Sequence, residues 1–437
     1  MFHAKKALCA AGLCAAFMSS AHAATEIQWW YSQTGAVSDR VLELADQFNK
    51  SQSDYKVVAT YKGGYDEAMA AAIAAFRAGN APNILQVFEV GTATMMHAKG
   101  AVVPVAELMK KAGESFDPSA YVPAVAGYYT SARGEMQSLP FNASTTVFYY
   151  NKDKFAKAGL DPEKPPVTWQ DVVSAAAKLK ASGERCAYTT GWQSWVHLES
   201  FSAWHNVEFA SKGNGLGGLD TRLKFNSPLH VRHIENLANW ARQGYFSYGG
   251  RKSEPDAKFY SGECAMITSS SATYANIAKN AKFKFAVAAL PYYSDVPGAP
   301  QNTVLGGASL WAMSGKSANE NRGVARFFKF LSQPEVQAKW HQDTNYLPTT
   351  KVAYELTSKS GFYQKNPGTD IAVQQMIVKT TDKSRGIRLG NYVQIRAIED
   401  EELEQVWAGK KSAKEALDAI VTRGNELLER FQKASKS

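Results

Sequence analysis

Aromatic and polar residues, together with one pair of glycines, recur in this sequence at either end of strand-like or helix-like segments. They are Trp29-Trp30-Tyr31, Tyr65, Glu89, Trp192, Trp195, Ser269-Ser270-Ser271, Gly306-Gly307 and Tyr346. In open α/β sheets, ligands bind beyond the carboxyl ends of the strands. Core packing would explain any one of these aromatic residues, but their recurrence at several element ends favours a binding cleft. The chemistry they predict is non-covalent capture of a small molecule.

Sequence motifs of covalent catalysis give no competing signal. Gly213–Gly218 matches a dinucleotide-binding motif by letter, but it neither follows a convincing strand nor opens a helix, so we interpret it as a flexible loop. The sequence contains no phosphate-binding loop, no H-E-x-x-H and no G-x-S-x-G. The eight histidines are scattered, and the carboxylates form no isolated pair of the kind glycosidases use. We therefore expect neither an enzyme nor a bound metal or cofactor.

The segments that would carry these residues alternate between strand and helix. The expected strands are Glu26–Tyr31, Tyr55–Tyr61, Asn83–Phe88, Cys186–Thr190, Gly262–Thr268 and Phe285–Leu290. The expected helices are Val37–Asn49, Tyr65–Ala78, a helix from Gly91, Thr168–Ala181, Val196–Asn206, Ser227–Gln243, Asn321–Leu331, Glu399–Trp407 and Ser412–Phe431. Such alternation predicts mainly parallel sheets covered by helices on both faces.

The first residues have the layout of a secretory signal. Lys5 and Lys6 form a basic start, Ala7–Met18 is a short apolar run, and Ala21-His22-Ala23 is an A-x-A cleavage site. The apolar run is shorter than the ~20 residues that span a bilayer. We therefore expect a soluble, exported protein that is cleaved after Ala23.

Length and charge narrow the class of protein further. The 437 residues exceed what one hydrophobic core usually serves, which predicts two lobes. Removing residues 1–23 lowers the formal charge from +9 to +7, because this segment holds two lysines and no acid. Basic and acidic residues are interleaved without a Lys/Arg block, so we expect no nucleic-acid partner. The moderate positive charge suits either an anionic ligand or a solvated surface.

Two cysteines, Cys186 and Cys264, lie beyond the expected signal segment, each in an apolar, strand-like context. In an oxidising compartment they could pair as a disulfide. The alternative is two buried thiols that pack as small apolar residues. Both alternatives stay open, because connectivity cannot be read from sequence.

The segment Leu139–Asp171 combines several structural signals. The β-branched and aromatic run from Thr145 to Tyr150 is typical of a strand. A short helix, Lys152–Gly159, follows and can end at its glycine. After two prolines, Thr168 is a good N-cap for a second helix, with Asp171 in its first turn.

Several longer stretches resemble one known family. They are Phe76–Pro82, Glu89–Met96, Tyr149–Asp153, Thr168–Asp171, Gly191–Gln193, Gly306–Trp311 and Arg388–Asn391. The whole chain resembles the extracellular solute-binding proteins of ABC importers, which include maltodextrin binders, and among them the periplasmic members that bind sn-glycerol-3-phosphate. The resemblance implies an α/β fold of the two-lobe, type II periplasmic binding protein kind. Each lobe would be a mainly parallel sheet covered by helices, with multiple crossovers.

The resemblance also implies a set of ligand-binding residues. In chain order these are Tyr65, Glu89, Ser144, Trp192, Ser270, Gly307, Tyr346 and Arg396. Glu89 would accept a hydrogen bond from a glycerol hydroxyl, and Ser144 and Ser270 would donate to phosphate. Gly307 would present its backbone N–H, and Tyr65 and Tyr346 would contribute phenols.

The charged and aromatic members of this set have separate expected roles. Arg396 would pair with the phosphate, because a planar guanidinium can donate two parallel hydrogen bonds. Arg388 is the alternative, since Tyr392-Val393 departs from the family pattern close to Arg396. Trp192 would wall the glycerol end, where its ring could meet the trimethylammonium group of glycerophosphocholine.

The implied function is capture of sn-glycerol-3-phosphate, and of glycerophosphodiesters such as glycerophosphocholine, by lobe closure. A membrane permease and its ATPase would then take the ligand from a monomeric periplasmic protein. We expect lobe 1 to comprise residues 24–143 and 288–343 and lobe 2 residues 147–287 and 348–437, with the cleft between them. An oligosaccharide-binding protein of the same fold is the alternative. A secreted phosphodiesterase is a further one, and the missing metal and nucleophile motifs argue against it.

Overall fold

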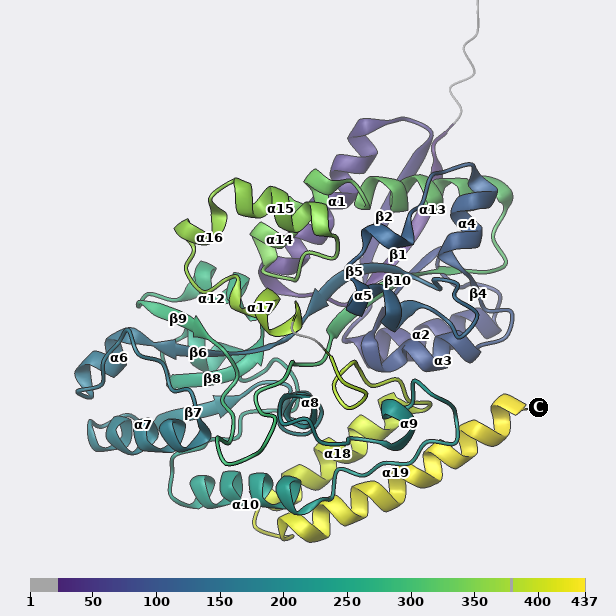
Figure 1. The fold of residues 1–437 in the computed structure, drawn as a ribbon. Helices are drawn as coiled ribbons and strands as arrows, with labels where there is room; N and C mark the ends of the chain where they lie inside the picture. Colours follow the sequence, from purple (N-terminus) through teal and green to yellow (C-terminus); the bar gives the residue numbers. More distant parts are fainter. Residues whose placement is uncertain (1–22, 378–379, 437) are drawn as a thin grey trace, which may run out of the picture.

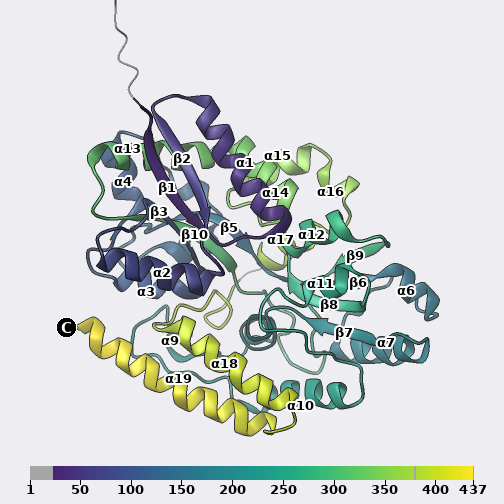
Figure 2. The same ribbon diagram turned by 180° about the vertical axis from the view of Figure 1, so that it is seen from behind.

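A computed structural model describes residues 23–377 and 380–436. The expected signal segment, 1–23, therefore lies almost wholly outside the described residues. The chain forms two α/β halves, one above the other in Figure 1, and Figure 2 shows the same division from behind. None of the described helices is long and apolar enough to cross a membrane.

The upper half is built on a six-stranded sheet with the order β2-β1-β3-β10-β4, in which β5 also pairs with β10. Its strands are β1 (Thr25–Tyr31), β2 (Tyr55–Tyr61), β3 (Ile84–Phe88), β4 (Val102–Val103), β5 (Leu139–Ser144) and β10 (Gly306–Met313). The lower half has a four-stranded sheet with the order β7-β8-β6-β9. Its strands are β6 (Thr146–Asn151), β7 (Cys186–Thr190), β8 (Cys264–Ser270) and β9 (Phe285–Ala288).

Helices cover both sheets (Figures 1 and 2). In the first part of the chain they are α1 (Gly35–Ser51), α2 (Tyr65–Arg77), α3 (Thr92–His97), α4 (Val105–Ala112) and α5 (Pro123–Tyr129). The middle part contains α6 (Lys152–Lys157), α7 (Trp169–Ala181), α8 (Phe201–Trp204), α9 (Ser211–Asn214), α10 (Pro228–Arg242), α11 (Asp256–Tyr260) and α12 (Thr273–Asn280). The last part contains α13 (Ala318–Leu331), α14 (Pro334–Thr344), α15 (Lys351–Lys359), α16 (Phe362–Lys365), α17 (Ile371–Ile377), α18 (Tyr392–Trp407) and α19 (Ala413–Lys436). Short 3-10 turns lie at Glu89–Gly91 and Pro118–Ala120, and Trp195–Ser200 is π-helical.

The α/β class is as expected, but the prediction of mainly parallel sheets is wrong. β1 pairs in parallel with β2 and β3, and β7 with β8. In contrast, β10 runs antiparallel to β3, β4 and β5, and β6 runs antiparallel to β8 and β9. The antiparallel strands lie next to the crossings between the two sheets. A strand that enters a sheet from the other half can arrive in either direction, and the alternation of elements carries no information about this.

The chain crosses between the halves within a single residue. β5 ends at Ser144 in the first sheet and β6 begins at Thr146 in the second. Between them, Thr145 is fully buried, and its carbonyl accepts a hydrogen bond from Ser271 N at 2.8 Å. This short crossing places the ends of both sheets against one cavity.

Two other stretches pack differently from the expected lobe boundaries. Trp204 Nε1 donates to Leu290 O at 2.8 Å, which ties residues following β9 to the lower half. Thr350 forms an isolated antiparallel bridge with Tyr121, which ties the start of α15 to the upper half. The division into lobes stays a proposal, and we propose to count α15 with lobe 1 and Leu290 with lobe 2.

Cys186 and Cys264 form a disulfide between β7 and β8, with their Cα atoms 4.5 Å apart. The two residues face each other directly in the parallel pairing of these strands. The structure thus decides between the two alternatives that the sequence left open.

Candidate ligand-binding site

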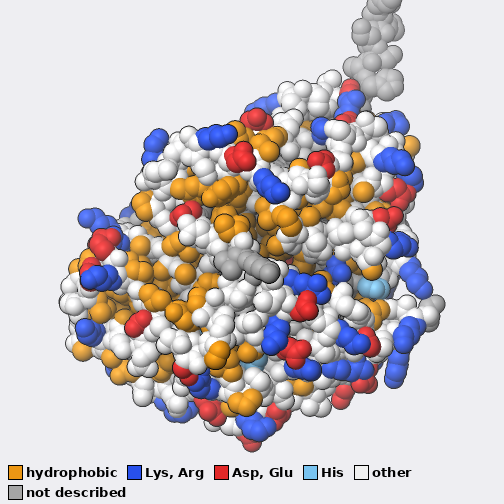
Figure 3. Space-filling view, viewed as in Figure 1, with side chains coloured by type: hydrophobic (Ala, Val, Ile, Leu, Met, Phe, Trp, Pro, Cys, Tyr) orange, Lys and Arg blue, Asp and Glu red, His pale blue; other side chains and the backbone are white. Residues whose placement is uncertain are grey.

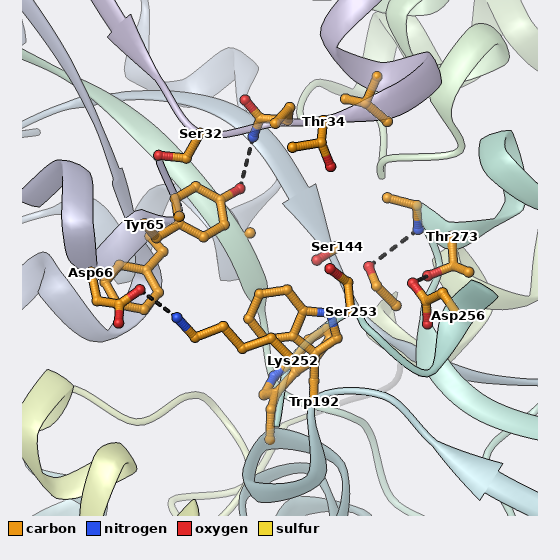
Figure 4. Close-up of a pocket in the computed structure, with 18 of the residues that line it drawn as sticks. Ser32, Thr34, Tyr65, Asp66, Ser144, Trp192, Lys252, Ser253, Asp256 and Thr273 are labelled. Carbon is orange, nitrogen blue, oxygen red and sulfur yellow. Dashed lines mark hydrogen bonds and ion pairs between the residues drawn. The ribbon is translucent and has the colours of Figure 1, made fainter. Parts of the chain in front are cut away.

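A cavity of about 340 Å³ lies between the two halves, and all eight predicted ligand residues line it. They come from segments up to 331 positions apart in the sequence, between Tyr65 and Arg396. Figure 4 shows Tyr65, Ser144 and Trp192 on separate elements around this space. The sequence therefore predicted which residues meet here, whereas their individual roles toward a ligand stay predictions.

Two phenols from the upper half are held rigidly at the cavity wall. The ring of Tyr65 stacks on Phe88 at 5.2 Å, and the ring of Tyr346 stacks on Trp340 at 5.7 Å. Tyr65 Oη accepts hydrogen bonds from Gln33 Nε2 at 2.8 Å and Asn142 Nδ2 at 2.9 Å. Burial raises the pKa of both tyrosines, so both phenols keep their protons and can donate to an anion.

Gly307 occupies a position that only glycine can fill. Its φ of +86° lies in the left-handed region, and a Cβ would meet Asn142 O at 1.9 Å. The neighbouring Gly306 pairs with Ser144 across β10 and β5, and a Cβ there would meet the Trp195 ring at 2.2 Å. The missing side chains therefore bring the backbone of β10 close to Ser144 and to the cavity.

Ser270 ends β8 at the opposite side of the crossing and pairs with Thr146. Its Oγ accepts a hydrogen bond from Ala272 N at 3.2 Å, so its own O–H can donate elsewhere. Tyr149 Oη donates to the carbonyls of Ser270 and Ser271, both at 2.9 Å, and thereby fixes this turn. Ser144 thus faces the cavity from β5, which leads into the crossing, and Ser270 faces it from β8, which pairs with β6 beyond the crossing.

Trp192 has a strained backbone, with φ of +53° in the left-handed region. Its N–H donates to Lys252 O at 2.7 Å, which ties the turn after β7 to the loop before α11. This conformation directs the indole ring toward the cavity, where Figure 4 shows Trp192 beside Lys252. Strain of this kind persists only where surrounding contacts fix the residue, and it is concentrated at functional sites.

Arg396, on α18, lies between two buried carboxylates. Its Nη2 donates to Glu89 Oε1 and Glu199 Oε2, both at 2.7 Å, and its Nε donates to Glu199 Oε1 at 2.8 Å. Burial alone would lower the pKa of Arg396, but Glu199 and Glu89 outweigh burial and raise it. Since Glu89 follows β3 in the upper half and Arg396 belongs to the lower half, this ion pair also bridges the cleft.

A third carboxyl near this cluster, Glu399, is fully buried, and neither of its oxygens has a hydrogen-bond partner among the described residues. Burial, reinforced by Glu199, raises its pKa well above the ordinary value, so Glu399 is a neutral acid. The guanidinium of Arg396 thus bonds to Glu89 and Glu199, and the neutral Glu399 adds no further buried charge to the cluster.

Arg388, the alternative anion partner, lies elsewhere. Its Nη1 donates to the backbone carbonyls of Tyr128 at 3.0 Å and Thr130 at 2.8 Å. It lines a second, more apolar cavity on another part of the surface, together with Val122 and Tyr354. Around that region, Figure 3 shows hydrophobic side chains gathered near the middle of the face, with basic and acidic side chains interspersed around them.

Several cavity residues were not predicted from the sequence. These are Ser32, Gln33, Thr34, Asp66, Glu67, Lys252, Ser253, Glu254, Asp256, Thr273 and Asn276. Lys252 Nζ donates to Asp66 Oδ1 at 2.5 Å across the mouth of the cavity, as Figure 4 shows. Glu199, which holds Arg396 from behind, was also missed. Some of these residues lie in loops and others on helices such as α2, α11 and α12, and what they share is a position beside the cavity that only the folded chain creates.

Two α/β halves joined by crossing strands, with a cavity between them that both halves line, define a periplasmic-binding-protein fold of the two-lobe type. The family model of the bacterial extracellular solute-binding protein matches residues 43–370. The chain belongs to this family.

Curated relatives and solved structures agree with this assignment. The chain is 54% identical to the sn-glycerol-3-phosphate-binding periplasmic protein UgpB of Pectobacterium atrosepticum over 98% of this chain and 97% of that protein. It is 55% identical to UgpB of an Escherichia coli strain, covering 97% of each chain. With these relatives, the chain is a periplasmic substrate-binding protein.

Among solved structures, the fold is similar to UgpB from Mycobacterium tuberculosis in complex with glycerophosphocholine. The TM-score is 0.78 at 22% identity, covering 93% of this chain and 99% of that one. The maltose-bound MalE3 of T. maritima has a TM-score of 0.76 at 16% identity, covering 92% and 99% of the two chains. At these identities the likeness concerns the fold alone.

Proposed function

We propose that this protein captures sn-glycerol-3-phosphate, and glycerophosphodiesters such as glycerophosphocholine, and delivers them to the permease and ATPase of an ABC importer. The observation that carries the proposal is the convergence of neutral hydrogen-bond donors on one cavity in a chain about 55% identical to sn-glycerol-3-phosphate-binding proteins. A buried phosphate needs several such donors, because an anion removed from water without partners is very costly.

The phosphate would lie near the crossing between the sheets. The hydroxyls of Ser144 and Ser270 would donate hydrogen bonds to the phosphate from its two sides, and the backbone N–H of Gly307 would donate a further one. The phenols of Tyr65 and Tyr346 would complete the donor set from the upper half. These donors are fixed by strands and ring stacking before the ligand arrives, which lowers the entropic cost of binding.

The glycerol end would lie toward Glu89 and Trp192. A carboxylate held by Arg396 can accept from two hydroxyls, and the indole face covers the carbon chain. Arg396 Nη1 has no hydrogen-bond partner within residues 23–377 and 380–436, so it remains available for a ligand oxygen. The predicted pairing of Arg396 with phosphate would have to use this nitrogen.

Lobe closure would exclude water from the bound ligand and strengthen each of these bonds. The Lys252–Asp66 and Arg396–Glu89 pairs join the two halves and would favour the closed state. A ligand shifts the open and closed populations only by its preference for one of them. The permease would then recognise and bind the closed, ligand-loaded form.

Calorimetric titration tests the proposal directly. We expect sn-glycerol-3-phosphate and glycerophosphocholine to bind wild-type protein and maltose to give no heat. Tight maltose binding without a response to either phosphate would instead favour an oligosaccharide-binding protein. Arg396→Ala should weaken binding at least tenfold, and unchanged affinity would remove Arg396 from the ligand set only. Turnover of a chromogenic phosphodiester by purified protein would support the enzymatic alternative.

A further inference from the structure

A buried carboxyl, Asp256, lies in the wall of the proposed anion site. Its side chain is 6% exposed and lines the same cavity as Ser144 and Ser270. Oδ1 accepts from Ser269 Oγ at 2.7 Å and Oδ2 from Thr273 Oγ1 at 2.8 Å. Among the described residues no Lys, Arg or His forms an ion pair with it. A carboxyl without a cation is an unexpected component of a pocket for anions.

Asp256 joins the three turns with which the lower half borders the cavity. It begins α11, directly after the loop that contains Lys252 and Ser253. Its bond to Ser269 fixes the residue before Ser270, and its bond to Thr273 fixes the start of α12. The turn that leads to Trp192 packs closely against the same carboxyl, since a Cβ on Gly191 would lie 2.9 Å from Asp256 Oδ1. Figure 4 shows Asp256 and Thr273 beside Ser253 and Ser144.

We propose that Asp256 is a positioning residue that holds the phosphate-binding turn of the lower half, and that it takes up a proton when an anionic ligand binds. The proposal rests on the proposed function. An ionised Asp256 would repel a phosphate bound at Ser270, whereas a protonated Asp256 would not. Anion binding and protonation of this carboxyl therefore favour each other.

The surroundings support this linkage. Burial raises the pKa of Asp256 to about 7, while the bonds from Ser269 and Thr273 oppose this rise and Glu254 adds to it. Tyr149 on β6 and Tyr274 on α12 face the same region as neutral phenols, because burial raises the pKa of each. Lys252, the nearest basic residue of the loop, is engaged with Asp66. Within the described part of the chain, no neighbouring cation therefore keeps Asp256 ionised when an anion arrives.

The consequence is a dependence of affinity on pH and on ligand charge. If the ionised form binds an anion poorly, affinity falls about tenfold between pH 6 and pH 8, as one linked proton requires. A phosphomonoester gains a second negative charge in the same range, since its second pKa is about 6. Above neutral pH the site should therefore favour monoanionic diesters over the dianionic monoester.

Glycerophosphocholine is the suitable ligand for this test, because its phosphodiester does not titrate near neutral pH. Any proton taken up when it binds is therefore taken up by the protein. We would titrate it into wild-type protein and Asp256→Asn at pH 7.5, in two buffers of different ionisation enthalpy. The dependence of the heat on the buffer gives the number of protons exchanged. We expect uptake of more than about half a proton by wild type and none by Asp256→Asn. Asp400→Asn, which alters another buried acid near the cleft, should take up as many protons as wild type.

A second variant covers the case in which Asp256→Asn does not fold. Thr273→Val removes one donor to the carboxylate and should move the pH range of proton uptake upward. Equal uptake in wild type and Asp256→Asn, or no uptake in wild type, would overturn the proposal while leaving the proposed function intact. Absence of any binding heat with both glycerol phosphates would instead refute the proposed function.

Discussion

Replacing His230 should make the stability of this protein less sensitive to acid. His230 belongs to a cluster of four buried histidines in the lower half, with His197, His205 and His233. Its Nε2 contacts Ser202 Oγ at 2.8 Å and its Nδ1 contacts Ser227 Oγ at 2.7 Å. Burial, together with a smaller contribution from the nearby His205, lowers the pKa of His230 to about 3. The folded protein thus holds this imidazole neutral well below neutral pH.

The sign and size of this pH dependence follow from the pKa of His230 in the folded and in the unfolded state. In the unfolded chain a histidine has a pKa of about 6.5, so acid protonates the unfolded state first. The stabilisation due to a neutral buried His230 is complete above that value and is lost as the pH falls below it. At pH 5 the loss amounts to about 2 kcal/mol, since each pH unit contributes 1.36 kcal/mol. At pH 7.5, His230→Gln should lower the free energy of unfolding by about 1–3 kcal/mol because its hydrogen bonds are altered. At pH 5 the difference from wild type should be about 2 kcal/mol smaller, because the variant has no imidazole to protonate in the unfolded chain.

The assay is urea unfolding of wild type and His230→Gln at both pH values, followed by circular dichroism. The comparison of two proteins is necessary because burial raises the pKa of Asp256 to about 7 and that of Asp400 to about 6. As the pH falls, these acids increase the free energy of unfolding whereas the buried histidines decrease it. The contribution of the acids is the same in both proteins, so it cancels in the comparison. Replacement of the exposed His97 by Gln serves as the control and should cost the same at both pH values. An equal cost of His230→Gln at pH 7.5 and pH 5 would refute the reasoning.

Two further predictions concern covalent and ionic links. Replacing both Cys186 and Cys264 by Ser should destabilise the oxidised protein by about 4 kcal/mol, because the disulfide closes a loop with a sequence separation of 78. Thermal unfolding with and without a reductant checks this, and a difference that persists under reduction would contradict it. Lys252→Met should change stability by less than about 1 kcal/mol, since its ion pair is partly exposed. It should nevertheless increase the radius of gyration of the ligand-free protein in X-ray scattering, unlike Lys339→Met, whose partner Asp343 lies on the same helix.

Local sequence patterns predicted many secondary-structure elements closely. The strand Tyr55–Tyr61 and the strand Cys186–Thr190 occur with the expected bounds. The helix beginning after Thr168 has the expected N-cap, and Asp171 N–H donates to Thr168 Oγ1 at 3.1 Å. Capping and period-two patterning depend on neighbours within a few residues, so they can be read from the chain alone.

Elements that depend on distant partners were missed. β10 begins with two glycines that look like a turn, and it is a strand because β3 and β5 pair with it on both sides. The expected helix Asn321–Leu331 is followed by the unpredicted helix α14, which begins at Pro334, a position that suits proline. The predicted helix Val196–Asn206 contains a π-helical turn that places Glu199 against Arg396.

The sequence by itself determined the family, most elements and the eight residues that meet at the cavity, because motifs and local patterns survive in the linear order of residues. Tertiary structure alone decided the mixed direction of the sheets, the Cys186–Cys264 disulfide and the partners of Arg396. It also showed that Asp256 is a buried acid in the wall of this cavity, with no ion pair to a Lys, Arg or His of the described residues. Charges interact through space at distances of a few ångströms, and residues separated by hundreds of positions come within that range only when the chain has folded.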